Sequence, residues 1–224
     1  MEFGDLVRMI AVSAVPVIFA ITLHEAAHGY VAGRLGDKTA TMLGRVSLNP
    51  ARHIDWVGTI LLPLVMLFVS SGRLMFGWAK PVPVNFDALR NPKRDMLWVA
   101  LAGPAANLLM AVGWAAALKV GTLAGLRNDD FLAEVPSAGV GVNLVFMALN
   151  LLPILPLDGG RIVVSLLPKP LAWRFSRLEP YGLPILLGLV FISSYGYNIL
   201  GWLLYPIMYA SKSVIEAIFQ VYLI

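Results

Sequence analysis

The residues best suited to chemistry are His24, Glu25 and His28, which form the pattern H-E-x-x-H. On a helix, positions four apart lie one above the other on the same face, so the two imidazoles can bind one tetrahedral zinc ion. Glu25 lies on the adjacent face, where a carboxylate can accept a proton from water at the metal. The alternative is that these side chains only bond to neighbouring helices, but two of the three histidines in the chain fall in this motif. The pattern therefore predicts a zinc site with Glu25 as general base.

The third zinc ligand has to come from elsewhere in the chain, because a catalytic site uses three protein ligands and one open position. The absence of cysteine excludes thiolate ligands. The remaining histidine, His53, follows Arg52 in a polar stretch, which favours an anchor at the interface or a loop salt bridge over metal binding. Asp158 ends the apolar run 137–157 and precedes two glycines that let the backbone turn sharply. Spacing alone leaves Asp158 either a metal ligand or the cap of a surface turn.

The composition predicts a membrane protein to hold these residues. Of the 224 residues, 58% are hydrophobic and 13% charged, whereas soluble domains carry about 45–50% apolar and about 25% charged residues. Three segments suit membrane helices, 8–32, 96–118 and 137–157. The segment 181–224 suits one span with an interfacial helix or two short spans, and 161–178 suggests an amphipathic interfacial helix. The basic residues are scattered over short loops, so we expect no nucleic-acid partner.

The short apolar segment 56–71 decides the topology. It contains Pro63 and is followed by a basic loop. If it crosses the membrane, the seventeen Lys and Arg residues divide ten to seven between the two sides; if it dips in and returns, they divide thirteen to four. Because cytoplasmic loops collect basic residues, the pattern favours a dip. The helices that carry His24 and Asp158 then run in the same direction, their ligands meet toward the cytoplasmic ends, and Asp158 becomes the favoured third ligand.

Several motifs together identify a family. HEAAH and the later NLLPILPLDGG resemble the site-2 protease family of intramembrane zinc metalloproteases, while GRVSLNPARHID, GWAKPVPVN and GPAANLL resemble its short prokaryotic branch. The likeness covers about residues 20–180. It implies that His24, His28 and Asp158 bind one Zn²⁺, that Glu25 is the base, and that Asn150 lies near the metal and holds substrate or the developing oxyanion.

The resemblance also implies a fold and a location. We expect an all-α polytopic protein, a bundle of about four to six membrane segments with a membrane-dipping re-entrant or β element around GWAKPVPVN. Residues 1–224 would form a single membrane-embedded domain, with the zinc-site core at about 8–160 and amphipathic and membrane segments at 161–224. No room is visible for a PDZ insertion or a CBS tail. The expected location is the prokaryotic cell membrane, with the active site toward the cytoplasm.

The expected substrates are single-span membrane proteins that are cleaved within or near their helices. The protein itself is expected to contact the lipid bilayer. An extended Lys80–Asn85 strand could pair with unwound substrate through Val82 and Val84, because Pro81 and Pro83 lack an N–H. Asn107 in GPAANLL suits either an interhelical hydrogen bond or the substrate cleft. A rival hypothesis is a metal-handling or transport protein with the same ligands, but transporters usually show internal repeats, and none is visible. The sequence does not predict the oligomeric state.

Overall fold

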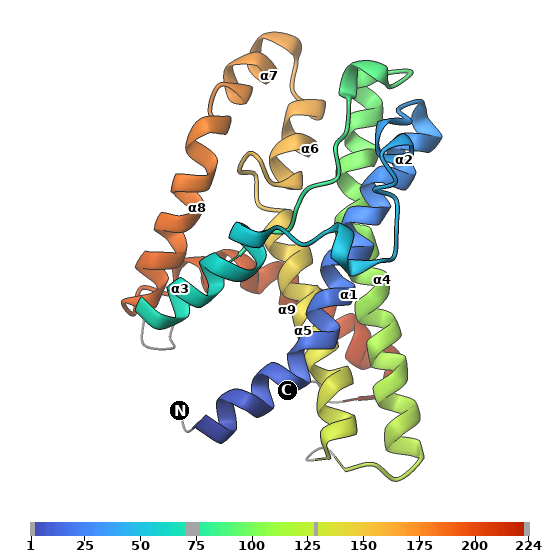
Figure 1. Cartoon of the computed structure of the whole chain (residues 1–224), viewed down its shortest axis with the longest axis vertical. Coiled ribbons are helices and arrows are strands. Elements are labelled where there is room, and N and C mark those ends of the chain that lie inside the picture. Colours follow the sequence, from blue (N-terminus) through green and yellow to red (C-terminus); the bar gives the residue numbers. More distant parts are fainter. Residues whose placement is uncertain (1–2, 70–76, 128–129, 222–224) are drawn as a thin grey trace.

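Three long helices form the centre of the protein, for which a computed structural model describes residues 3–69, 77–127 and 130–221 (Figure 1). They are α1 (Phe3–Leu35), α4 (Pro92–Leu123) and α5 (Phe131–Asn150). All three are long and apolar enough to cross a membrane. α1 and α5 run in the same direction and α4 runs against them. This arrangement confirms the helical membrane fold, and the shared direction of α1 and α5 agrees with the re-entrant topology.

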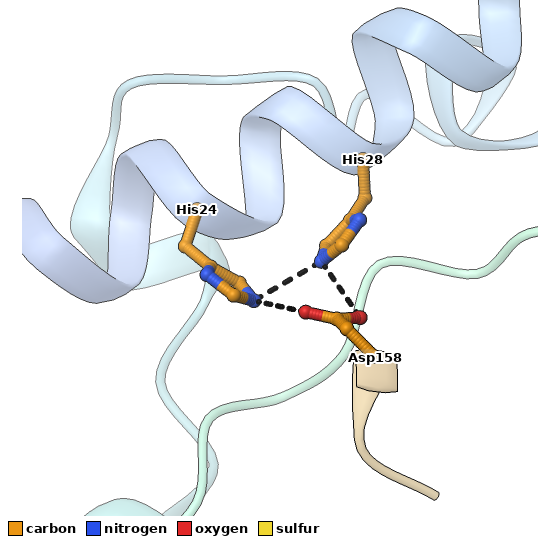
Figure 2. A group of neighbouring side chains, drawn as sticks. All are labelled: His24, His28 and Asp158. Carbon is orange, nitrogen blue, oxygen red and sulfur yellow. Dashed lines mark hydrogen bonds and ion pairs between the residues drawn. The ribbon is translucent and has the colours of Figure 1, made fainter. Parts of the chain in front are cut away.

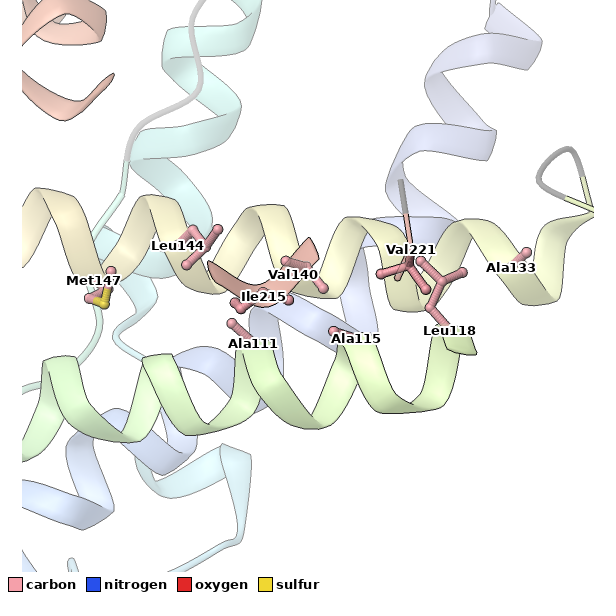
Figure 3. Close-up of a cluster of buried hydrophobic side chains, with 9 residues drawn as sticks. All are labelled: Ala111, Ala115, Leu118, Ala133, Val140, Leu144, Met147, Ile215 and Val221. Atoms are coloured by element: carbon pink, nitrogen blue, oxygen red, sulfur yellow. The ribbon is translucent and has the colours of Figure 1, made fainter. Parts of the chain in front are cut away.

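Small side chains let α4 and α5 approach closely. Ala111 and Ala115 on α4 are fully buried against Val140 of α5 (Figure 3). Gly139 of α5 lies directly under the Trp114 ring, so even a methyl group there would overlap the indole. The rest of this core comes from Leu118, Ala133, Leu144, Met147, Ile215 of the last helix and Val221.

The segment between α1 and α4 leaves and rejoins the same end of the bundle (Figure 1). It contains α2 (Thr39–Met42), η1 (Pro50–Arg52), η2 (Trp56–Leu61), α3 (Leu62–Val69) and η3 (Phe86–Ala88). The Arg90 N–H donates to the Leu35 carbonyl at 3.0 Å, and the Asn85 N–H donates to Asp37 Oδ2 at 2.7 Å. These bonds place the start of α4 beside the end of α1, as a dip predicts. Residues 70–76, which hold the end of the expected dip, lie outside the described residues.

The element expected around GWAKPVPVN is an extended segment rather than part of a sheet. Within the described ranges no residue is in a β-strand, and residues 77–85 run without a ladder partner. Pro81 and Pro83 have no N–H to donate, which prevents regular strand pairing. The Lys80 N–H instead bonds to the His53 carbonyl at 2.9 Å. The expected β element is thus corrected to an extended strap.

Four helices follow the core: α6 (Asp158–Leu166), α7 (Lys169–Ser176), α8 (Glu179–Ser194) and α9 (Ile199–Phe219). The expected interfacial helix at 161–178 is therefore split at Pro168, which cannot continue a helix. α7 and α8 meet at 58° and together could form a fourth span. Among the described residues, three or four candidate spans and the short apolar helix Trp56–Met66 give four or five membrane segments, at the lower end of the predicted four to six. An ion pair joins α6 to α8, because Arg161 Nη2 lies 2.6 Å from Glu179 Oε1.

Candidate metal centre

Three side chains from two elements far apart in the sequence point toward one another (Figure 2). His24 and His28 project from one face of α1, and Asp158 is the first residue of α6. His24 Nε2 lies 3.2 Å from Asp158 Oδ2, His28 Nε2 lies 3.3 Å from Asp158 Oδ1, and the two Nε2 atoms are 3.0 Å apart. The structure thus brings together the three residues predicted as metal ligands, in a group that could hold one ion.

Hydrogen bonds behind the imidazoles fix which ring nitrogen faces the centre. His24 Nδ1 lies 2.6 Å from Asn107 Oδ1, and His28 Nδ1 lies 2.7 Å from the carbonyl oxygen of Val99. Both partners are acceptors, so each Nδ1 carries the proton and each Nε2 presents a lone pair. Metal-binding histidines are commonly held in this way, by an acceptor on the nitrogen that does not bind the metal.

Asn107 is itself oriented by a third helix. Its amide Nδ2 donates to Asn143 Oδ1 at 3.0 Å and to the Ala20 carbonyl at 3.3 Å, which leaves Oδ1 to face His24. Asn143 donates in turn to the Gly139 carbonyl at 2.8 Å. Both asparagine side chains are fully buried. The chain of bonds therefore links α5, α4 and α1 and sets the orientation of His24.

The centre suits a cation, and zinc in particular. Two Nε2 lone pairs and a carboxylate would repel one another if nothing positive lay between them. Asp158 Oδ2 is buried without a hydrogen bond. Tetrahedral zinc with Zn–N bonds of about 2.0–2.1 Å places its ligand atoms about 3.3 Å apart, close to the observed 3.0–3.3 Å. Gly103 of α4 faces the imidazoles, and a Cβ there would overlap His24 and His28.

The loop before α6 delivers Asp158 to this position. The helix expected to reach residue 157 ends at Asn150, and residues 151–157 form a loop containing Pro153 and Pro156. A Cβ at Gly159 would overlap the Leu151 carbonyl, so the loop doubles back and brings the end of α5 beside the start of α6. Asn150 therefore lies next to the turn that carries Asp158. Its Nδ2 donates to the Phe146 carbonyl at 3.0 Å, within its own helix.

Glu25 is held at the edge of the centre by the extended strap. Its Oε2 accepts the Val82 N–H at 2.7 Å, and the side chain is half-buried. The Val82 N–H, which we expected to pair with substrate, is therefore engaged by the carboxylate. The other residue of that expected pair, Val84, packs its side chain against the apolar cluster of Ala32, Leu89 and Val99.

Two further predicted residues find structural roles. Asn107 is fully buried behind His24, which favours the interhelical hydrogen bond over contact with a substrate. His53 is also buried, and its Nε2 lies 2.8 Å from the Ser47 carbonyl oxygen, so it belongs to the loop fold. The sequence did not indicate Asn143, and it indicated Gly103 only as a small residue for close helix packing, not as the residue that leaves room for His24 and His28. A lone amide within an apolar membrane helix is a signal that could have marked Asn143.

Comparisons with known proteins add an independent line of evidence. The chain is 34% identical over 214 residues to "Putative zinc metalloprotease YwhC" of Bacillus subtilis (strain 168), covering 92% of this chain and 90% of that relative. It is 31% identical over 166 residues to Rip2 and 30% identical over 161 residues to Rip3, two Mycobacterium tuberculosis proteins with the same description. It spans only 60% of Rip2 and 31% of Rip3. No protein-family model and no solved structure matches the chain significantly.

The fold and the centre define a polytopic helical membrane protein with a group of two histidines and one aspartate that could hold a zinc ion. Its likeness to YwhC extends over nearly the whole of both chains, and the HEAAH and LDGG motifs supply the residues that converge at the centre. The chain belongs to the site-2 protease family of zinc metalloproteases.

Proposed function

We propose that this metalloprotease works inside the membrane, hydrolysing peptide bonds within or near the transmembrane helices of single-span proteins. The observation that carries the proposal is the place of the centre. His24 and His28 lie within Val7–Leu35, a helix that qualifies as a membrane span. Both are buried. Because ionisable side chains inside a membrane span are costly, their presence there favours a function at that depth.

Glu25 is proposed as the general base. Zinc, when bound, polarises the scissile carbonyl and makes water more acidic. Glu25 Oε2 is occupied by the Val82 N–H, so Oε1 is the oxygen proposed to take the proton as water adds to the carbonyl carbon. The same carboxyl then returns the proton to the leaving nitrogen as the C–N bond breaks. Asn150, beside the turn of Asp158, is proposed to hold substrate or the developing oxyanion.

The substrate helix has to unwind before hydrolysis, because its carbonyls are hidden in i to i−4 hydrogen bonds. Unpaired backbone groups in lipid cost several kcal/mol each, so replacement partners are needed. We propose that the extended strap offers them through Val84 rather than Val82, whose N–H is engaged by Glu25. Substrates with Gly, Pro or Asn near the cytoplasmic half of their helix should therefore be preferred.

A matched pair of single-span reporters in proteoliposomes tests this function. One reporter carries a Gly-Asn step and the other Leu-Leu at the same depth, and mass spectrometry locates the cut. We expect cleavage within or next to the span and faster cleavage of the Gly-Asn reporter. Absence of cleavage together with zinc flux into empty vesicles would favour transport instead, and equal rates would remove unwinding as the source of selectivity.

The side of the membrane on which the site opens is also a proposal. The Arg90 N–H donates to the Leu35 carbonyl, and Lys38 directly follows Asp37, which accepts the Asn85 N–H. Lys38 and Arg90 therefore lie at the same end of the bundle. The chain has no cysteine, so Lys38→Cys and Arg90→Cys can each be labelled with an impermeant thiol reagent. We expect both to react from the cytoplasmic side only, and labelling from opposite sides would refute the re-entrant topology.

A further inference from the structure

The strap that contacts Glu25 is fastened from its other side by an arginine. Arg45, in the loop after α2, directs Nη2 to two successive carbonyl oxygens, of Lys80 at 2.9 Å and of Pro81 at 3.3 Å. The backbone of Arg45 is held in turn, because its N–H donates to the Ala40 carbonyl at 2.8 Å. A guanidinium on an anchored loop thus grips the strap directly before Val82.

The Pro81–Val82 peptide group connects this arginine to Glu25. In a planar trans peptide, the carbonyl and the following N–H point to opposite sides. The Pro81 carbonyl accepts from Arg45, and the Val82 N–H donates to Glu25 Oε2 at 2.7 Å. Fixing the carbonyl on one side therefore aims the N–H on the other. A cation on the carbonyl also polarises the peptide and strengthens the N–H as a donor.

The sequence around Val82 offers no neighbouring N–H that could replace its hydrogen bond to Glu25. Val82 lies between Pro81 and Pro83, so its N–H is the one donor in that tripeptide. The Val82 side chain is buried over Gly29, one turn along α1 from Glu25, where a Cβ would lie 3.0 Å from it. Val46, next to Arg45, crowds the same glycine, at 2.8 Å from that position. Loop and strap therefore pack together on α1 beside the carboxylate.

We propose that Arg45 is a positioning residue for the general base: through the Pro81–Val82 peptide it holds the N–H that fixes the Glu25 carboxylate. This inference rests on the proposed role of Glu25. Arg45 is distinct from the metal ligands and from their hydrogen-bonding partners. Its removal should therefore change the turnover of bound substrate without removing zinc.

Arg45→Gln is the direct test, with Arg34→Gln as a matched control. Arg34 loses the same charge near the same end of α1 but bonds to Tyr30 Oη, one turn away on its own helix. A displaced catalytic group costs up to about 100-fold in rate, so we expect kcat of Arg45→Gln to fall about 10- to 100-fold, with KM and zinc content unchanged. Arg45→Lys should recover part of kcat, because an ammonium keeps the charge and can donate to a carbonyl oxygen, but on a shorter and more flexible side chain.

Amide hydrogen exchange provides a readout that does not depend on activity. A peptide covering residues 80–84 contains only the Lys80, Val82 and Val84 amides, because its other residues are prolines. Exchange at Val82 should accelerate in Arg45→Gln, whereas the Asn85 amide, held by Asp37 at 2.7 Å, should not change. In Arg34→Gln both should exchange as in the unaltered protein.

Three outcomes would overturn the inference. They are unchanged kcat in Arg45→Gln, whether or not KM rises, loss of zinc, and unchanged exchange at Val82. Glu25→Gln, assayed in parallel, distinguishes the proposed base role of Glu25 from the positioning role of Arg45. If Glu25→Gln keeps full activity, the proposed role of the base fails; if it is inactive while Arg45→Gln matches the unaltered protein, only the positioning role fails.

Discussion

Replacing Asn107 with leucine tests how the fold prepares His24 for zinc. Leucine has a similar size but can neither accept the Nδ1–H of His24 nor donate to Asn143 Oδ1, bonds that measure 2.6 Å and 3.0 Å. Two buried polar groups then lose their partner. Without its acceptor, the His24 ring is free to turn or to place its proton on Nε2, and either change removes the lone pair that the metal needs.

The size of the effect follows from these contacts. Loss of an outer hydrogen bond to a metal-binding histidine typically costs about 10- to 100-fold in metal affinity, which is about 1.4–2.8 kcal/mol at about 1.4 kcal/mol per tenfold. Leaving buried polar groups unpaired costs about 1–3 kcal/mol each, but interhelical bonds in membranes average only about 0.6 kcal/mol. We therefore expect the fold to lose about 1–3 kcal/mol, and zinc affinity to fall about 10- to 100-fold.

Asn107→Asp is the matched control. A carboxylate can still accept from His24 Nδ1, but it cannot donate to Asn143 or to the Ala20 carbonyl. Both variants should lower the melting temperature of the metal-free protein, whereas only Asn107→Leu should lose zinc affinity, measured by competition with a chelator in detergent. If the leucine variant binds zinc as tightly as the aspartate variant, Asn107 does not set the orientation of His24.

Three further predictions concern the metal ligands, the space around the imidazoles, and the pH dependence of the stability that Asp37 contributes. Asp158→Ala should lose its zinc to a chelator while His53→Ala keeps it, and the reverse would reassign the third ligand. Gly103→Ala should lower zinc affinity because its methyl group overlaps both imidazoles, whereas Gly113→Ala, which meets nothing within 4 Å, should be neutral in the same chelator titration. Burial alone would raise the pKa of Asp37, but the hydrogen bonds that it accepts from Thr39 and Asn85 outweigh burial and lower the pKa. Asp37 therefore stabilises the fold above the usual aspartate pKa and loses this effect as pH falls through its lowered value. In melting scans, Asp37→Asn should be less stable than the unaltered protein at neutral pH, with the difference shrinking in acid; a constant difference would contradict the shift.

Much of the centre could be predicted from the sequence, because its parts are local. The spacing of His24 and His28 fixes their common helix face wherever the helix lies. Asp158 was harder, since spacing alone left it either a metal ligand or the cap of a surface turn. Its assignment needed the charge distribution of the loops, which set the direction of the helices. The structure brings Asp158 to the histidines.

The outer contacts could not be read from the sequence, because they depend on which helix faces which. Asn107 was weighed as a substrate contact, yet its burial between α1 and α5 makes it a partner of His24. Asn143 does not belong to any of the motifs recognised in the sequence. The strap at 77–85 was expected as a β element, but its prolines leave the backbone extended without a partner strand. The engagement of Val82 with Glu25 depends on that strap crossing α1.

Glu25→Gln, assayed for zinc and for cleavage in the same preparation, tests the central claim most directly. Glutamine retains a carbonyl oxygen that can accept the Val82 N–H, so the local geometry is kept while the proton acceptor is lost. We predict a protein that binds zinc as the unaltered chain does but does not cleave a single-span reporter. Full cleavage by this variant would contradict the account.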